Sequence, residues 1–114
     1  MTTSELVLTL AGAHGVAGSE GKAAGLAREL LSACGPCEQT PLGSLICRVC
    51  TAPEDRPHIL LVAHMDEIGM VVTHIDDNGF LRVGNCGGVD RATLPAAQIQ
   101  VHTKDGILEG VVCT

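Results

Sequence analysis

The sequence predicts an α/β fold. A helical repeat of apolar residues lies in the first third of the chain, an aliphatic run follows at residues 59–63, and hairpin patterns fill the remainder. The aliphatic run is too short for a typical helix and is rich in branched side chains, so we predict a strand buried on both faces of a helix-covered sheet. Functional residues of such sheets gather at the carboxyl ends of the strands.

Two helices are predicted ahead of this strand. Thr2 and Glu5 have the spacing of a capping box, and the short helix that they start ends at Gly12. After a glycine-rich loop, Ser19 is placed to cap a second helix, and Gly35 terminates it. The apolar residues of the second helix recur at helical spacing and form one face. They are Ala23, Leu26, Ala27, Leu30, Leu31 and Cys34.

The remaining elements are strands. One is predicted over residues 45–51, after a turn at Leu42-Gly43. Alternating residues from 68 to 75 lead into Asp76-Asp77-Asn78-Gly79, which favours a primed hairpin turn because Asn-Gly tolerates positive φ values. A second hairpin is predicted across Lys104-Asp105-Gly106. The sequence thus changes near Glu67 from helices and sheet to hairpins alone.

Composition excludes several classes of protein. The 114 residues carry a net charge of −6, which argues against nucleic acid or anionic membranes as partners. No apolar run approaches the roughly 20 residues that a membrane helix needs, and the N-terminus lacks the pattern of a signal peptide. We therefore expect a soluble cytoplasmic protein. With one Phe and no Trp or Tyr, any core must be built from aliphatic and small residues.

Six cysteines are expected to stay reduced in that compartment. Cys34-Gly35-Pro36-Cys37 looks like a thioredoxin redox motif, but here it follows a helix and precedes an extended segment, the reverse of the thioredoxin order. With Cys47 and Cys50 it also spells a zinc pattern. Residues three apart in a strand face opposite ways, so buried or idle thiols are favoured over structural zinc.

A polar cluster follows the predicted buried strand. His64 and Asp66 alternate with Met65 and Glu67, so in a strand the first two point to the same side. A neutral imidazole is a common ligand for a divalent metal, and a carboxylate at its other nitrogen fixes the tautomer. The alternative is a hydrogen-bonded His beside a solvated acidic pair, and the spacing alone favours that alternative.

The wider context of this cluster resembles the glutamyl aminopeptidase family, also called the tetrahedral aminopeptidases. The segments that carry the resemblance span most of the chain. They are 15–20, 42–46, His64-Met-Asp-Glu-Ile-Gly69, 73–81, Gly87-Gly88-Val89-Asp90, 104–106 and 110–112. Two positions depart from the family pattern: Ser44 stands where Asn is usual, and Val89 where Trp is frequent.

The resemblance implies a fold and an activity. Residues 1–67 would form the N-terminal part of an α/β metallopeptidase catalytic domain, and residues 68–114 the start of an inserted β-barrel-like domain. The chain would then be the N-terminal fragment of a homo-oligomeric enzyme that hydrolyses N-terminal residues from peptides. Such enzymes use two divalent metals, with zinc or cobalt expected here, and a separate carboxylate as general base.

The resemblance also assigns roles to individual residues. His64 matches the first metal ligand, and Asp66 matches the residue that orients its imidazole. Glu67 belongs to the same motif, and His14 is a further polar candidate in a loop near the cleft. The other ligands and the base match motifs beyond residue 114, so the isolated chain is not expected to hydrolyse peptides. Two alternatives remain: a non-catalytic β-rich oligomerisation or binding module, and a small cysteine-zinc protein.

Overall fold

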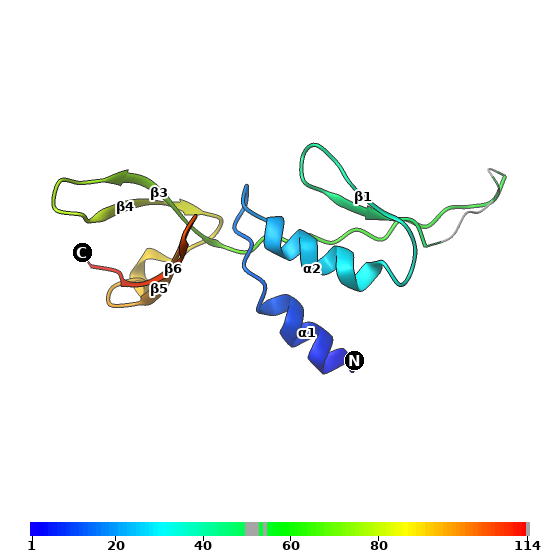
Figure 1. Cartoon of the computed structure of the whole chain (residues 1–114), viewed down its shortest axis with the longest axis horizontal. Coiled ribbons are helices and arrows are strands. Elements are labelled where there is room, and N and C mark those ends of the chain that lie inside the picture. Colours follow the sequence, from blue (N-terminus) through cyan, green and yellow to red (C-terminus); the bar gives the residue numbers. More distant parts are fainter. Residues whose placement is uncertain (50–52, 54, 114) are drawn as a thin grey trace.

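The computed structural model describes residues 1–49, 53 and 55–113 and shows an elongated molecule (Figure 1). Its dimensions are 62 × 31 × 29 Å and its radius of gyration is 18.2 Å, whereas a compact domain of about this length has a radius of roughly 13 Å. Among the described residues, the only buried apolar side chains are Ala23 and Ala24, at 7% and 3% exposure. The described chain therefore has almost no core of its own.

Both predicted helices are present. Helix α1 spans Thr3–Ala11 and ends at Gly12, and the capping box is confirmed: Thr2 Oγ1 accepts from the Glu5 amide, and Glu5 accepts from the Thr2 amide. Helix α2 spans Gly21–Leu31. The prediction that Ser19 caps α2 is wrong, because the N-cap residue is Glu20 and its carboxylate accepts from the Gly18 amide instead.

A small hairpin packs beside α2. Strand β1 (Cys37–Gln39) pairs antiparallel with β2 (Leu45–Cys47), and α2 contacts β2. Strand β1 was not predicted, and β2 ends earlier than the predicted strand 45–51, of which residues 50 and 51 lie outside the described residues. The chain reverses between α2 and β1 at Gly35, where an added Cβ would collide with the carbonyl oxygen of Arg48.

The predicted strand over residues 59–63 is wrong for this structure. Residues 57–66 run as a long trace past α2 without a strand partner among the described residues (Figure 1). Ile59, Leu60, Leu61 and Val62 are 82 to 90% exposed. The burial predicted for both faces is therefore also wrong, because the described residues supply neither a neighbouring strand nor a covering helix for this segment.

The first long hairpin pairs β3 (Gly69–Ile75) with β4 (Leu81–Cys86). Its position was predicted correctly, but its turn is not a primed one. The amide of Gly79 donates to the carbonyl of Asp76 at 2.9 Å, and φ is positive at Gly79 (85°) but not at Asn78. Asp76 stabilises this three-residue turn because its carboxylate accepts from the amides of Asn78 and Phe80.

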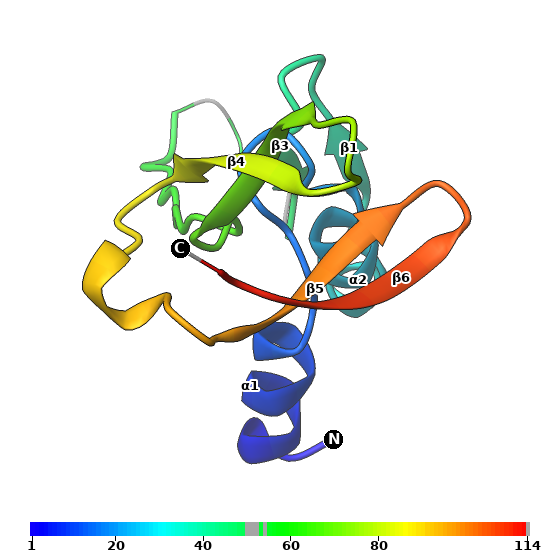
Figure 2. The same cartoon turned by 90° about the vertical axis from the view of Figure 1, so that its left-hand side faces the viewer.

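The second hairpin is confirmed as β5 (Gln98–Thr103) paired with β6 (Gly106–Val111), preceded by a short 3₁₀ helix, η1 (Arg91–Thr93). Both long hairpins lie at the same end of the molecule, away from β1 (Figures 1 and 2). The described chain therefore mixes helices with two-stranded antiparallel sheets. None of its described helices is both long and apolar enough to cross a membrane.

Candidate functional site

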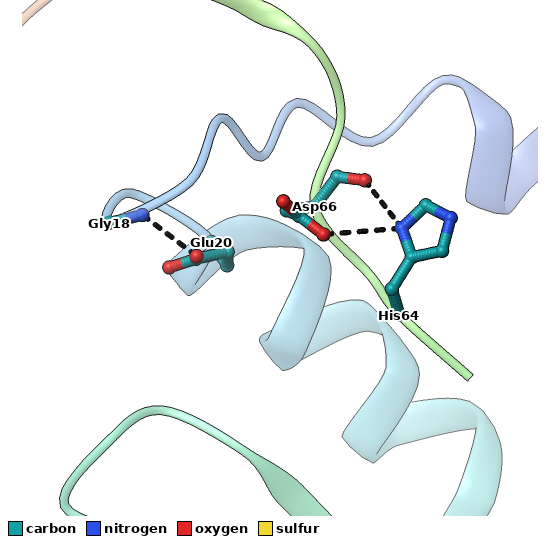
Figure 3. A network of polar contacts seen from close by, with 4 residues as sticks. All are labelled: Gly18, Glu20, His64 and Asp66. Carbon is teal, nitrogen blue, oxygen red and sulfur yellow. Dashed lines mark hydrogen bonds and ion pairs between the residues drawn. The ribbon is translucent and has the colours of Figure 1, made fainter. Parts of the chain in front are cut away.

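His64 and Asp66 form a pair at the end of the extended segment. The Nδ1 atom of His64 lies 2.9 Å from the main-chain oxygen of Asp66 and 3.2 Å from its Oδ1 atom (Figure 3). A carbonyl oxygen can only accept, so Nδ1 carries the hydrogen and donates to both atoms. In the tautomer with its hydrogen on Nδ1, the lone pair lies on Nε2, and the side chain that carries this nitrogen is 85% exposed.

Glu67 ties the same segment to the loop after α1. Its amide donates to the carbonyl oxygen of Gly15 at 2.8 Å, and its Oε1 atom accepts from the Gly15 amide at 3.0 Å. Val16 and Glu67 form an isolated parallel bridge at this point. Glu67 therefore holds the end of the polar cluster, through one main-chain and one side-chain hydrogen bond, to a residue 52 positions earlier in the sequence.

A glycine permits this approach. A Cβ atom added to Gly69 would lie 2.5 Å from Cγ2 of Val16, closer than two carbon atoms can pack. Gly69, at the end of the His64–Gly69 motif, is therefore favoured for steric reasons. Because it has no Cβ, β3 can begin in direct contact with the loop that Glu67 binds.

His14 belongs to this second group of contacts and not to the His64 pair. Its Nδ1 atom lies 3.9 Å from Oε1 of Glu67, and its ring centroid lies 4.6 Å from that of His102 at an interplanar angle of 55°. The four predicted site residues therefore form two pairs, His64 with Asp66 and His14 with Glu67. His102, predicted to be exposed beside a turn, is exposed but also contacts His14, and no sequence spacing could reveal a contact between residues so far apart.

Within the described ranges, no three His, Cys, Asp or Glu side chains come together as a metal site. His64 can therefore supply one ligand, but the described residues do not complete a site around it. The cysteine-zinc alternative depends on Cys50, which lies outside the described residues.

Comparisons with known proteins point to one family. The sequence profile of the M42 glutamyl aminopeptidase family matches residues 43–114. A lysyl aminopeptidase from Pyrococcus furiosus is 48% identical over 56 residues, which cover 49% of this chain and 16% of that protein.

Solved structures, aminopeptidases among them, also resemble this chain, over nearly all of its length. PhTET1-12s, which was solved as a dodecamer, superposes with a TM-score of 0.88 at 31% identity, covering 100% of this chain and 34% of that one. An aminopeptidase from the archaeon Desulfurococcus kamchatkensis gives a TM-score of 0.83 at 34% identity, covering 94% and 30%. The chain thus spans about a third or less of the relatives that it matches.

Proposed function

Because the chain belongs to the M42 glutamyl aminopeptidase family, we propose that it forms part of a metal-dependent aminopeptidase and contributes the first metal ligand. The observation that supports this most directly is the contact of His64 Nδ1 with Asp66 at 2.9 and 3.2 Å. An imidazole held through one nitrogen by a carboxylate presents the other nitrogen to a cation in a fixed direction and with raised basicity.

The donor set suits a borderline divalent cation such as zinc or cobalt, because imidazole nitrogen is a good ligand for both. Two such cations, when bound, lower the pKa of a shared water toward about 7 and polarise the scissile carbonyl of a peptide. In this proposal His64 binds one cation through Nε2, and Asp66 positions the ring. Glu67 and His14 hold the neighbouring loop in place and do not bind metal.

A catalytic zinc usually takes three protein ligands, and the described residues offer one. We therefore propose that the 114 residues alone do not hydrolyse peptides. Residues 1–67 would contribute to the α/β catalytic domain, since they contain both helices and the His64 pair. Residues 68–114 would belong to an inserted β-rich domain, since they contain only hairpins and one short 3₁₀ helix. The composition supports a cytoplasmic location.

Assembly is a second candidate role for the hairpins. Val71, Val72, Ile75 and Phe80 of the first long hairpin and its turn are each at least 42% exposed, and PhTET1-12s is a dodecamer. Apolar side chains in this number on one ribbon are typical of an interface. We propose that the protein forms a homo-oligomer and that this hairpin contributes to its contacts.

Activity is tested on the full-length natural translation product that carries these residues, with substrates that have a free or a blocked N-terminus. Hydrolysis of only the free-amine substrate, lost on removal of metal and restored by zinc or cobalt, is expected. His64→Ala should lower both metal content and activity, whereas His58→Ala, an exposed histidine in the same extended segment, should change neither. Full activity in His64→Ala would remove this residue from the metal site.

Assembly is tested separately by sedimentation of the same proteins. His64→Ala should sediment as the parent does, because the hairpins are unchanged. A parent that sediments as a monomer would contradict the assembly proposal while leaving the aminopeptidase proposal intact.

A further inference from the structure

Two cysteines face each other across the small hairpin. Cys37 of β1 is the register partner of Cys47 of β2. The Arg48 amide donates to the Pro36 carbonyl at 3.1 Å, and the Thr40 amide donates to the Ser44 carbonyl at 2.9 Å. Since hydrogen-bonded and non-hydrogen-bonded pairs alternate along an antiparallel ladder, Cys37 and Cys47 occupy a non-hydrogen-bonded pair.

That register position suits a covalent bond between the two sulfurs. The Cα atoms of a non-hydrogen-bonded pair are about 4.5 Å apart, and the side chains lie closer than at the alternate positions. Disulfides span Cα separations of roughly 4.4 to 6.8 Å. A bond between Cys37 and Cys47 therefore needs no movement of the strands.

Both thiols also lie near the same carbonyl oxygen. The Sγ atom of Cys37 lies 3.6 Å from the carbonyl oxygen of Gly35, and that of Cys47 lies 3.8 Å from the same oxygen. Cys47 additionally contacts the Leu31 carbonyl at 3.6 Å, at the end of α2. The two sulfurs therefore share one face of the hairpin, under the turn that Gly35 allows to approach β2.

A third thiol lies near this pair. Partial burial, a hydrogen bond with Cys37 and the nearby thiols of Cys37 and Cys34 raise the pKa of Cys47 above its ordinary value of 9.0. Cys34 is exposed and precedes the turn. The arrangement thus offers two possible partners for Cys37, and the register favours Cys47 over Cys34.

We propose that Cys37 and Cys47 are a redox modification site, at which a low-molecular-weight disulfide such as oxidised glutathione converts the two thiols into a disulfide across β1 and β2. This site is separate from the His64 pair and does not depend on the proposed aminopeptidase activity. Closure would fix the hairpin and its contact with the end of α2, and a reducing thiol would reverse it.

The reaction balances as two thiol–disulfide exchanges. The thiolate of Cys37 attacks one sulfur of oxidised glutathione, and the expelled glutathione takes up a proton. Cys47 then loses its proton and attacks the sulfur of Cys37, forming the intramolecular bond and expelling the second glutathione. Two protein thiols are oxidised, and one glutathione disulfide is reduced to two thiols.

The site is tested by mapping disulfides in the full-length natural translation product after exposure to oxidised glutathione and alkylation. Trypsin alone leaves Cys34, Cys37 and Cys47 in one peptide, so a glutamyl endopeptidase is added. The combined digestion separates residues 30–38, with Cys34 and Cys37, from 39–48, with Cys47, and from 49–54, with Cys50. A link between 30–38 and 39–48 is expected.

Variants identify the partner in 30–38. Cys37→Ser should lose the link and Cys34→Ser should retain it. Oxidation in denaturing urea should instead favour the disulfide between Cys34 and Cys37 within 30–38. The unfolded chain has no register to select the partner, and this pair closes the shorter loop. A native link within 30–38, a link from 30–38 to 49–54, or a stable glutathione adduct without an intramolecular bond would each overturn the proposal.

Discussion

Glu67 and Gly15 bind each other twice, with the amide of each residue donating to an oxygen of the other at 2.8 and 3.0 Å. One of these bonds uses the carboxylate of Glu67, so it can be removed without changing the main chain. Because Gly15 is buried, its amide has no ready access to water as a substitute partner.

Glu67→Ala should therefore release the loop at residues 13–18. We expect the Gly15 amide to exchange its hydrogen about tenfold faster, equivalent to about 1.4 kcal/mol of local stability. Glu67→Gln is the matched control because it keeps an acceptor oxygen, and it should exchange nearly as the parent does. Equal exchange in all three proteins would show that the carboxylate contact does not hold the loop.

Asp66 should matter for metal affinity and not for folding. Removing a carboxylate that orients a ligating imidazole typically costs 10- to 100-fold in metal affinity, so Asp66→Ala should weaken zinc binding by roughly 10-fold. Competition with a chromogenic chelator measures this in the full-length product. Asp77→Asn, in the exposed turn after β3, should leave the affinity unchanged, and an equal loss in both variants would point to a general charge effect.

The turn between β3 and β4 should depend on the backbone of Gly79. Its φ of 85° is unfavourable for an L side chain, while no atom lies within 4 Å of an added Cβ. Gly79→Ala should thus cost about 1 kcal/mol of unfolding free energy through strain alone. Gly88→Ala meets equally open space without a positive φ, and it should cost clearly less. Both costs are measured by urea titration of the full-length natural translation product.

The isolated 114-residue chain should not unfold cooperatively. Burial of two alanines cannot offset the conformational entropy of ordering more than 100 residues. Circular dichroism should show a broad, shallow loss of signal on heating and a small urea dependence. A sharp transition that coincides for different probes would contradict this expectation.

The raised pKa of Cys47 makes the stability of the folded state depend on pH. The folded state holds the proton more tightly than the unfolded state, so this stabilisation is complete below the ordinary value of 9.0 and is lost as pH rises through the raised value. Alkylation of Cys47 under native conditions should therefore be slower than in urea at pH 9. The difference should shrink at higher pH, and Cys37→Ser should reduce it by removing one of the causes.

Local signals in the sequence predicted local structure well. The capping box of α1 and both long hairpins depend on residues a few positions apart, and the structure confirms them. The turn at Asp76–Gly79 was placed correctly but given the wrong type, because Asn-Gly also fits a turn in which only the glycine has a positive φ. The predicted cap of α2 was wrong because the helix begins one residue later, with Glu20 at the N-cap and its carboxylate bound to the Gly18 amide.

Contacts between distant residues were harder to predict. His64 and Asp66 are only two residues apart, and their pairing was predicted from the motif. The strand that was expected to align them is absent. Strand β1 was missed, and the register of Cys37 with Cys47 was missed with it, since neither is encoded in a spacing. The contact of His14 with His102 likewise depends on how the loop and the second long hairpin meet in space.

The exposed aliphatic stretch at residues 59–62 has a consequence for the chain during its synthesis. Its amides and carbonyls have no main-chain partners among the described residues, and its side chains stand in water on both sides. An extended, uncharged ribbon of this kind is an open template on which other chains can add. Such exposure makes this stretch a target for chaperone binding during synthesis.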